Sequence, residues 1–360
     1  MTVVQPVKAT IGHVRRQPAR ATRPRLGFAG VGWIGRNRLL AVQESDVAEI
    51  AAIADPIEEQ RGAAGQIAPG AVAVASVHEL LELPLDGVVI ATPSALHAEQ
   101  ARAALDRGLA VFCQKPLGRT PAETRAVVDA ARSANRLLGV DFSYRHTAAA
   151  QALRACMGSA ERSIGDVHAV DLVFHNAYGP DKAWFYDRAL AGGGCLMDLG
   201  IHLVDLALWL LGFPEVACVH GRLMAGGKPL RDPGQQVEDF AAAQLELATG
   251  AVVQLRCSWR LPAGRDAIIE ASFYGAHGGL ALRNVNGSFY DFVAERYTGT
   301  RSTALAEPPD AWGGRAAVAW ARALAAGARF DPAAEEIVTV AEILERIYAA
   351  AAAAPERLHV

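Results

Sequence analysis

The feature that most constrains the fold of this chain is a glycine-rich turn that joins a short apolar strand to a helix. The strand covers residues 25–29 (RLGFA), the turn reads Gly30-Val31-Gly32-Trp33-Ile34-Gly35, and a helical pattern follows. In this G-x-G-x-x-G arrangement the first glycine allows a tight turn, the second lets the backbone approach a pyrophosphate, and the third lets helix and strand pack closely. The helix N-terminus then directs its amides at the phosphates. The segment predicts a dinucleotide site.

A second strand supports this interpretation and indicates which dinucleotide binds. The segment VAEIAAIAD ends in Asp55, twenty positions after Gly35. A carboxylate there can accept hydrogen bonds from an adenosine ribose with a free 2′-hydroxyl, so the sequence favours NAD over NADP. The alternative is that Asp55 only caps the helix that begins near Pro56.

Strands and helices alternate from residue 71 to residue 143, which is typical of a doubly wound parallel sheet, the Rossmann architecture. In such sheets ligands bind beyond the carboxyl ends of the strands. We therefore expect a cofactor site that includes Trp33, Ile34, Thr92, Pro93, Ser94, His97, Gln114 and Lys115. Lys115 follows a buried strand directly, which argues against an ordinary surface lysine.

The segment GGGCLMDLGIHLVDLALWLLG, residues 192–212, places polar groups in an apolar helix. At about 100° per residue, Asp198, His202, Asp205 and Trp209 fall on one stripe. Burying a carboxylate and an imidazole is costly unless they are paired or used, so the stripe needs partners from elsewhere in the chain. Taken singly, Asp198 could be a first-turn carboxylate favoured by the helix dipole, and His202 a satisfied core histidine.

The second half of the chain has a different order of predicted strands and helices. Segments between residues 166 and 285 read as strands, and the later ones are joined by turns without helices, which predicts antiparallel pairing in a large open sheet. The fold class is therefore α/β: an N-terminal Rossmann domain plus a C-terminal α+β domain. We expect a flexible basic arm (1–24), an NAD-binding domain (25–146), a substrate-binding and oligomerisation domain (147–332) and a C-terminal helix (333–360). A helix near Trp312 and Trp320 is expected to anchor the second domain.

Composition excludes several classes of partner. The net charge is −3, so there is no basic field suited to nucleic acid or an anionic membrane. The 192–212 run carries three ionisable groups, so it does not read as a membrane span. Five cysteines without C-x-x-C spacing favour neither a zinc site nor a disulfide framework, and they fit a reducing cytoplasm. Asp198 and His202 could share a metal, but too few ligands are visible, so no metal is expected.

Four segments together, GVGWIG, ATPSALHAEQARAALDRG, QKPLG and GGGCLMDLGIHLVDLALWLLG, resemble the Gfo/Idh/MocA family of sugar and cyclitol oxidoreductases. The resemblance implies that Lys115, Asp198 and His202 line the substrate carbon that faces the nicotinamide. It also implies a homodimer or homotetramer formed through the open sheet, and a final helix that packs back on the nucleotide domain. By resemblance, further contacts with cofactor or substrate come from Tyr144, Arg145, His175, Asn176 and Tyr178.

The residues suggest a chemistry for this site. His202 would remove the hydroxyl proton while hydride leaves the same carbon, Lys115 would polarise the oxygen, and Asp198 would orient the imidazole. The expected activity is that of an NAD-dependent dehydrogenase acting on a secondary hydroxyl of a sugar, inositol or aminocyclitol. The alternatives are a redox-neutral NAD-using enzyme, such as an epimerase or a glycoside-cleaving enzyme, and a non-catalytic sugar-sensing regulator.

Two further features bear on specificity. Gln114 stands where the family usually has glutamate, which predicts that Lys115 loses its proton more easily here. The loop before the glycines carries polar and aromatic residues that suit a carbohydrate, namely Asp181, Lys182, Trp184, Tyr186, Asp187 and Arg188.

Overall fold

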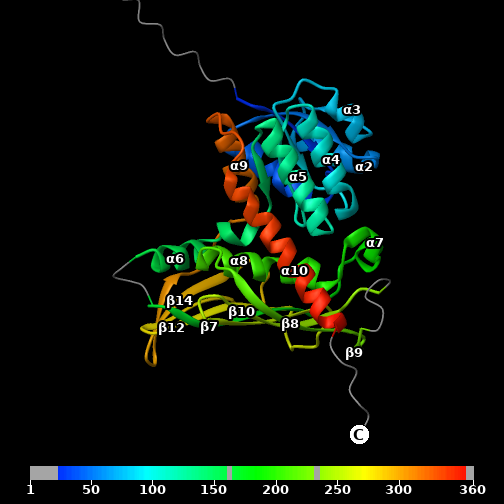
Figure 1. Ribbon diagram of the computed structural model, residues 1–360. Coiled ribbons are helices and arrows are strands. Elements are labelled where there is room, and N and C mark those ends of the chain that lie inside the picture. The colour runs from blue at the N-terminus through cyan, green and yellow to red at the C-terminus, as the bar shows by residue number, and fades with distance from the viewer. Residues whose placement is uncertain (1–22, 160–163, 231–235, 354–360) are drawn as a thin grey trace, which may run out of the picture.

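The chain forms two domains stacked one above the other, as the computed structural model shows (Figure 1). The structure describes residues 23–159, 164–230 and 236–353. The expected basic arm, 1–24, lies almost wholly outside the described residues.

The N-terminal domain is a six-stranded sheet in the order β3-β2-β1-β4-β5-β6, with every neighbouring pair parallel. This is the doubly wound order of a Rossmann domain, and it confirms the fold class predicted for this half. The strands are β1 (Arg25–Ala29), β2 (Glu49–Ala54), β3 (Val72–Val74), β4 (Gly87–Ile90), β5 (Ala110–Cys113) and β6 (Leu138–Val140). The helices are α1 (Trp33–Ser45), α2 (Glu58–Ile67), α3 (Val77–Leu81), α4 (Ser94–Asp106) and α5 (Pro121–Ala134).

A helix from the far end of the chain completes one face of this sheet. Helix α9 (Arg315–Ala325) packs beside α1, and its Trp320 ring lies against Phe112 of β5, with ring centroids 5.8 Å apart. Gly87 and Gly139 lie beneath the indole, and a Cβ on either would come within 2.9 Å of it. The glycines therefore make room for the tryptophan. Trp320 anchors the nucleotide domain, although its segment was expected to belong to the second domain.

The C-terminal domain is a nine-stranded sheet in the order β15-β14-β13-β12-β7-β11-β10-β8-β9. Among the described strands of this second sheet only the β7–β11 pair is parallel, so the predicted open, mostly antiparallel sheet is confirmed. The strands are β7 (Val167–Asn176), β8 (Val216–Ala225), β9 (Lys228–Pro229), β10 (Phe240–Leu247), β11 (Val252–Ser258), β12 (Ala267–Gly275), β13 (Gly278–Asn284), β14 (Phe292–Thr298) and β15 (Arg301–Ala306). The β14–β15 hairpin was not anticipated.

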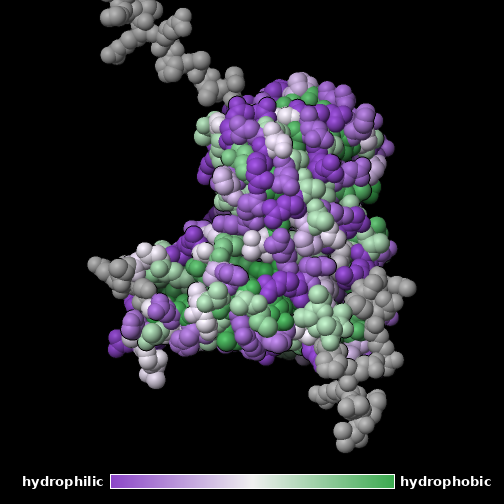
Figure 2. Space-filling model, in the orientation of Figure 1, coloured by the Kyte–Doolittle hydropathy of each residue, from purple (hydrophilic) through white to green (hydrophobic). Residues whose placement is uncertain are grey.

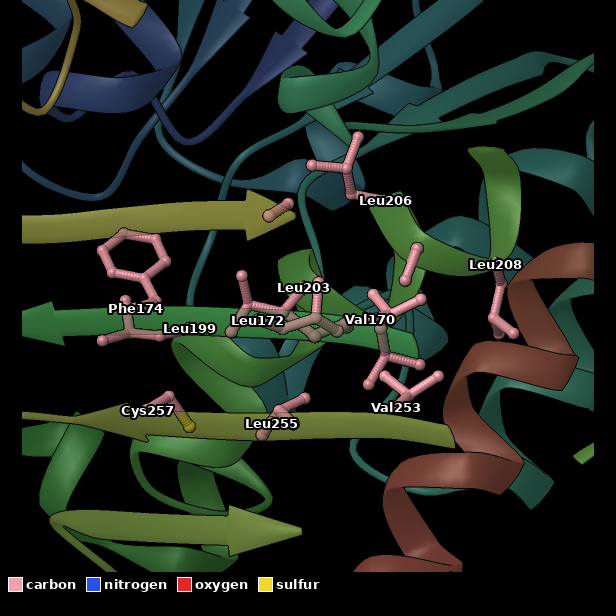
Figure 3. Close-up of a cluster of buried hydrophobic side chains, with 14 of the residues drawn as sticks. Val170, Leu172, Phe174, Leu199, Leu203, Leu206, Leu208, Val253, Leu255 and Cys257 are labelled. Atoms are coloured by element: carbon pink, nitrogen blue, oxygen red, sulfur yellow. The ribbon is translucent and has the colours of Figure 1, made fainter. Parts of the chain in front are cut away.

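Helices cover one face of this sheet and carry the polar stripe. They are α6 (Ala148–Met157), a short α7 (Arg188–Ala191), a π-helical segment η3 (Leu196–Gly200) and α8 (Ile201–Leu211). Figure 3 shows leucines of η3 and α8 packed against alternate residues of β7 and β11. The cluster includes Val170, Leu172, Phe174, Leu199, Leu203, Val253, Leu255 and Cys257. Alternation in the strands therefore buries one sheet face under the helix.

The final helix joins the two domains. Helix α10 (Glu335–Ala353) follows the 3-10 turn η4 (Pro332–Ala334) and contacts α5 of the Rossmann domain as well as α8 and β8 below it (Figure 1). Arg125 and Arg132 of α5 both pair with Glu335. The helix thus packs on the nucleotide domain, as expected, and also on the second domain.

The surface differs between the two domains, and the most apolar helical stretch is largely buried. In the view of Figure 2 the Rossmann domain is largely hydrophilic, whereas hydrophobic residues gather over the C-terminal domain. One helical stretch, Arg188–Leu211, is long and apolar enough to cross a membrane, but 78% of its apolar window is buried inside the protein. It is the core helix of the second domain.

Candidate active site between the two domains

The three glycines of the turn between β1 and α1 have different surroundings. Gly30 has a φ of +80°, and a Cβ on it would lie 2.6 Å from the Ala91 carbonyl oxygen. A Cβ on Gly35 would overlap the Gly30 carbonyl oxygen. Gly32 differs, because a Cβ there would meet only the Lys182 Nζ atom, at 3.9 Å, among the described atoms within 4 Å. Gly30 and Gly35 are explained by protein packing, and Gly32 is not.

Asp55 follows β2 and organises the glycine turn. One carboxylate oxygen accepts from the Val31 amide at 3.0 Å, and the other accepts from the Ile57 amide at 3.0 Å. The second bond closes a turn before α2, but the N-cap of α2 is Ile57 without a side-chain cap bond, so Asp55 does not cap that helix. A carboxylate has more acceptor positions than these two bonds occupy, so a ribose hydroxyl can still be bound at this strand end.

The segment after β4 lies at the carboxyl ends of the Rossmann strands, where the cofactor site is expected. Thr92 and Pro93 lie at its mouth, while Ser94 and His97 are buried at the start of α4. The two nitrogens of His97 face the carbonyl oxygens of Thr92 and Pro116, each at 2.7 Å. Both ring nitrogens are thus engaged by the protein. His97 joins the segment after β4 to the segment after β5, and no free nitrogen remains for a cofactor.

Gln114 belongs to a buried network behind the site. Its amide donates to the Asp141 carboxylate, which also accepts from the Arg38 Nε at 2.6 Å and from Ser143 at 2.5 Å. Asp141 is 1% exposed and Gln114 is 9% exposed. The glutamine therefore contributes a donor to a carboxylate that has no access to solvent.

Lys115 reaches from the end of β5 to the π-helical segment of the other domain. Its ammonium donates to the Asp198 carboxylate at 2.6 Å and to the Asp198 carbonyl at 2.7 Å. The indole of Trp259, just after β11, donates to the second Asp198 oxygen at 3.1 Å. Asp198 thus supplies a negative charge beside Lys115 in spite of the glutamine at position 114. What Gln114 implies for the Lys115 proton stays a prediction.

His202 lies one turn beyond Asp198, yet the two side chains do not bond to each other among the described contacts. The π-helical geometry of η3 changes the spacing that an α-helix would give, and π segments occur often at functional sites. Burial lowers the pKa of His202 well below its ordinary value, and the nearby cations Lys115 and Arg38 lower it further. Its Nδ1 atom is buried with no hydrogen-bond partner in the described chain. The imidazole is therefore neutral at physiological pH.

Tyr144 packs against His202, with ring centroids 4.9 Å apart. Its neighbour Arg145 instead faces Asp205, which accepts from the arginine at 2.6 and 2.9 Å, and Glu336 of α10 accepts at 3.0 Å. Burial raises the pKa of Asp205 to about 6 in spite of this arginine. The Nε, Nη1 and Nη2 atoms of Arg145 thus bond to carboxylates of the protein, and a contact of Arg145 with cofactor or substrate stays a prediction. Asp205 of the polar stripe therefore pairs with an arginine.

The remaining expected substrate residues lie at the end of β7. His175 contacts Ser258 at 2.8 Å, and the Asn176 side chain accepts from the Tyr178 amide at 2.7 Å. The Tyr178 hydroxyl donates to Asp266 at 2.6 Å, while its ring remains 55% exposed.

Glu238 was not anticipated from the sequence. It is fully buried, and its Oε1 atom accepts from the amides of Gly194 and Leu196 and from the Tyr348 hydroxyl, at 2.8 to 3.0 Å. Burial raises the pKa of Glu238, although these bonds oppose the shift. A Cβ on Gly193 or Gly194 would overlap Tyr348 or Glu238, respectively. The glycines before η3 thus allow Glu238 to fix the start of the helix that carries Asp198.

Comparison with known proteins identifies both halves of the chain. Residues 25–142 match the model described as "Oxidoreductase family, NAD-binding Rossmann fold", and residues 153–281 match the "GFO/IDH/MocA C-terminal domain". The chain is 36% identical over 179 residues to 1,5-anhydro-D-fructose reductase of Ensifer adhaerens, a stretch that covers 49% of this chain and 53% of the relative. It is 32% identical over 162 residues to inositol 2-dehydrogenase of Acidiphilium cryptum, which covers 44% and 47%. The matched stretch spans about half the length of these curated relatives.

Solved structures resemble the chain over almost its whole length. GenD2 from gentamicin A biosynthesis, in complex with NAD, has a TM-score of 0.77 and 25% identity, covering 95% of this chain and 98% of that one. Levoglucosan dehydrogenase, in complex with NADH and levoglucosan, has a TM-score of 0.77 and 24% identity, covering 91% and 97%. The second likeness concerns the fold alone.

Proposed function

The chain belongs to the Gfo/Idh/MocA oxidoreductase family and contains its NAD-binding Rossmann domain, and on that premise we propose that it transfers a hydride between NAD and a secondary hydroxyl of a sugar, inositol or aminocyclitol. The observation that carries this proposal is the Lys115–Asp198 pair, which spans the two domains next to a neutral His202. The names of its relatives, a sugar reductase and an inositol dehydrogenase among them, support the same substrate class.

The residues present fit the dinucleotide. Gly32 leaves open space at the N-terminus of α1, where amides and the helix dipole favour a pyrophosphate. Asp55 lies at the end of β2, where a carboxylate receives the ribose hydroxyls and disfavours a 2′-phosphate. We therefore propose NAD as the preferred cofactor. When bound, NAD supplies the acceptor for the hydride that leaves the substrate carbon.

His202 acts as the base in this proposal. Oxidation of a secondary alcohol breaks the carbinol C–H bond and the O–H bond, and the proton must go to a nearby group. An imidazole whose pKa is lowered by burial is in its proton-accepting form at neutral pH. A neutral imidazole suits the proton-accepting role that oxidation of the alcohol requires.

Lys115 would stabilise the charge that develops on the reacting oxygen. Its ammonium is held by two oxygens of Asp198, at 2.6 and 2.7 Å, so its position is fixed before substrate arrives. A preorganised cation of this kind lowers the barrier without reorganisation during the reaction. Asp198 is in turn held by Trp259, which makes it a positioning residue for Lys115 in this proposal.

We also propose a homodimer or homotetramer formed through the uncovered face of the nine-stranded sheet. A broad hollow beside these strands is lined by residues of β8, β10 and β11 and is bordered by Ala350 and Ala353 of α10. Antiparallel sheets pack readily on a second layer, which another copy would supply. Residence in the cytoplasm completes the proposal, and the five free cysteines support it.

The test is NADH formation with a panel of inositols, aldoses, sugar acids and aminocyclitols. Wild type would be compared with Lys115→Ala and His202→Ala, and with Lys228→Ala and His277→Ala as controls at exposed positions. We expect turnover with NAD that the first pair abolishes and the control pair retains. Retention of bound NAD with product but no net NADH would instead favour redox-neutral chemistry. Sugar binding with no turnover of any kind would favour a regulator.

A further inference from the structure

The glycine turn contains one glycine that the protein itself does not require. Gly32 has φ −62° and ψ −167°, a conformation open to any residue. Unlike Gly30 and Gly35, it has no backbone atom against it. The missing side chain therefore leaves room for something outside the chain, at the N-terminus of a thirteen-residue helix.

The only described atom that borders this space within 4 Å is a cation from the other domain. The Lys182 Nζ atom lies 3.9 Å from the position of a Cβ on Gly32. The ammonium makes no hydrogen bond or ion pair with any described residue, and the side chain is exposed. A positive charge without a partner thus lies beside the one open position of the turn.

The loop that carries Lys182 is held by its own domain. The Tyr186 hydroxyl, in the 3-10 turn η2 (Ala183–Tyr186), donates to the Pro180 carbonyl at 2.9 Å and accepts from Arg260 at 3.0 Å. Lys182 lies between these two anchored residues. The loop therefore presents its ammonium across the cleft to the glycine turn.

We propose that Lys182 binds the pyrophosphate of the dinucleotide, so that the C-terminal domain contributes directly to cofactor affinity. This inference rests on the proposed function. Helix N-terminal amides and a lysine ammonium are complementary phosphate ligands, because the amides are fixed and the ammonium is a mobile point charge. The sequence had assigned Lys182 to a carbohydrate-binding loop, whereas its position assigns it to the cofactor.

The geometry also implies that the cofactor links the two domains. The amides at the start of α1 belong to the Rossmann domain, and the Lys182 ammonium belongs to the substrate domain. A pyrophosphate between them is held from both sides. The contact between Lys182 and the phosphates must then break before the cofactor leaves, so the dissociation rate of the cofactor depends on this residue.

The experiment is a titration with NADH and with ADP-ribose, which carries the pyrophosphate but no nicotinamide. The proteins are wild type, Lys182→Ala, Lys182→Arg and the control Lys228→Ala, which removes an equal charge from the exposed β9 strand. Loss of a charge-assisted phosphate contact should weaken binding of both ligands about tenfold in Lys182→Ala. The arginine and control variants should bind within about twofold of wild type. The deficit should shrink at high salt, because the lost contact is electrostatic.

Each outcome has a distinct meaning. Wild-type protein that binds neither ligand overturns the proposed function. Wild-type protein that binds both ligands, with Lys182→Ala equal to it at low salt, overturns the inference and leaves the proposed function intact. A loss in Lys182→Arg as large as in Lys182→Ala also overturns it, because charge would then not matter. Thermal melting of each variant shows that the fold is retained.

Discussion

Alanine at Gly32 should weaken NADH binding and leave the fold stable, whereas alanine at Gly35 should lower the stability of the fold. At Gly32 the new methyl group meets open space, so it overlaps no atom of the folded protein. A less flexible unfolded chain contributes about 0.4–1 kcal/mol, which offsets the poorer N-capping of α1 by alanine. The same methyl group occupies the space that the pyrophosphate needs. Loss of one charge-assisted phosphate contact, about 1.5–3 kcal/mol, weakens NADH binding roughly ten- to a hundredfold.

At Gly35 the methyl group overlaps the Gly30 carbonyl oxygen, a backbone atom that cannot move without opening the turn. Overpacking of this kind costs about 1–3 kcal/mol, so Gly35→Ala should melt at a lower temperature. Gly62→Ala, on the open surface of α2, is the matched control for both measurements. NADH fluorescence titration and thermal melting give the two readouts. A Gly32→Ala variant that binds NADH as tightly as wild type would refute the argument that the open space above Gly32 is the pyrophosphate site.

Three further outcomes are expected. Since the pKa of His202 is lowered well below its ordinary value, kcat/KM for alcohol oxidation should not fall until the pH drops through that lowered pKa; a midpoint near 6.5 would contradict this. Gln114→Glu would put a second carboxylate against buried Asp141, and this like charge raises the pKa of the new glutamate. The loss of stability should therefore be present at pH 8 and smaller at pH 5, where the glutamate is partly protonated. Equal losses of melting temperature at both pH values would contradict this prediction. Asp205→Asn leaves Arg145 with a weaker buried partner and should lower the free energy of unfolding in urea by about 3 kcal/mol, and a change below about 1 kcal/mol would show that Glu336 alone suffices.

The sequence was informative wherever chemistry and local pattern coincide. The glycine turn, the strand ending at Asp55 and the lysine after β5 each carry a signal within about ten residues of themselves. Lys115 and Asp198 were predicted to share a site, and the structure joins them at 2.6 Å. The roles proposed for them stay predictions until activity is measured.

The partners that hold these residues in place could not be predicted, because tertiary packing alone brings them together. Glu238 is 40 residues from Asp198 along the chain, and its only local signal is an acidic pair directly before a strand. Trp259 and Asp141 likewise follow strands whose neighbours were unknown. The prediction of one polar stripe over residues 198–209 used α-helical spacing. Because η3 is π-helical, the angular spacing between Asp198 and His202 around the helix axis differs from that prediction.

The contribution of α9 to the first domain affects how the protein folds during synthesis. The face of the Rossmann sheet beside Phe28 and Phe112 is closed by Ala317 and Trp320, which are translated about 180 residues after β6. Until then a ribosome-bound chain has every strand of its first sheet but leaves apolar surface uncovered, the state in which nascent domains aggregate or bind chaperones. The nucleotide domain of this protein therefore matures only when nearly the whole chain has been made.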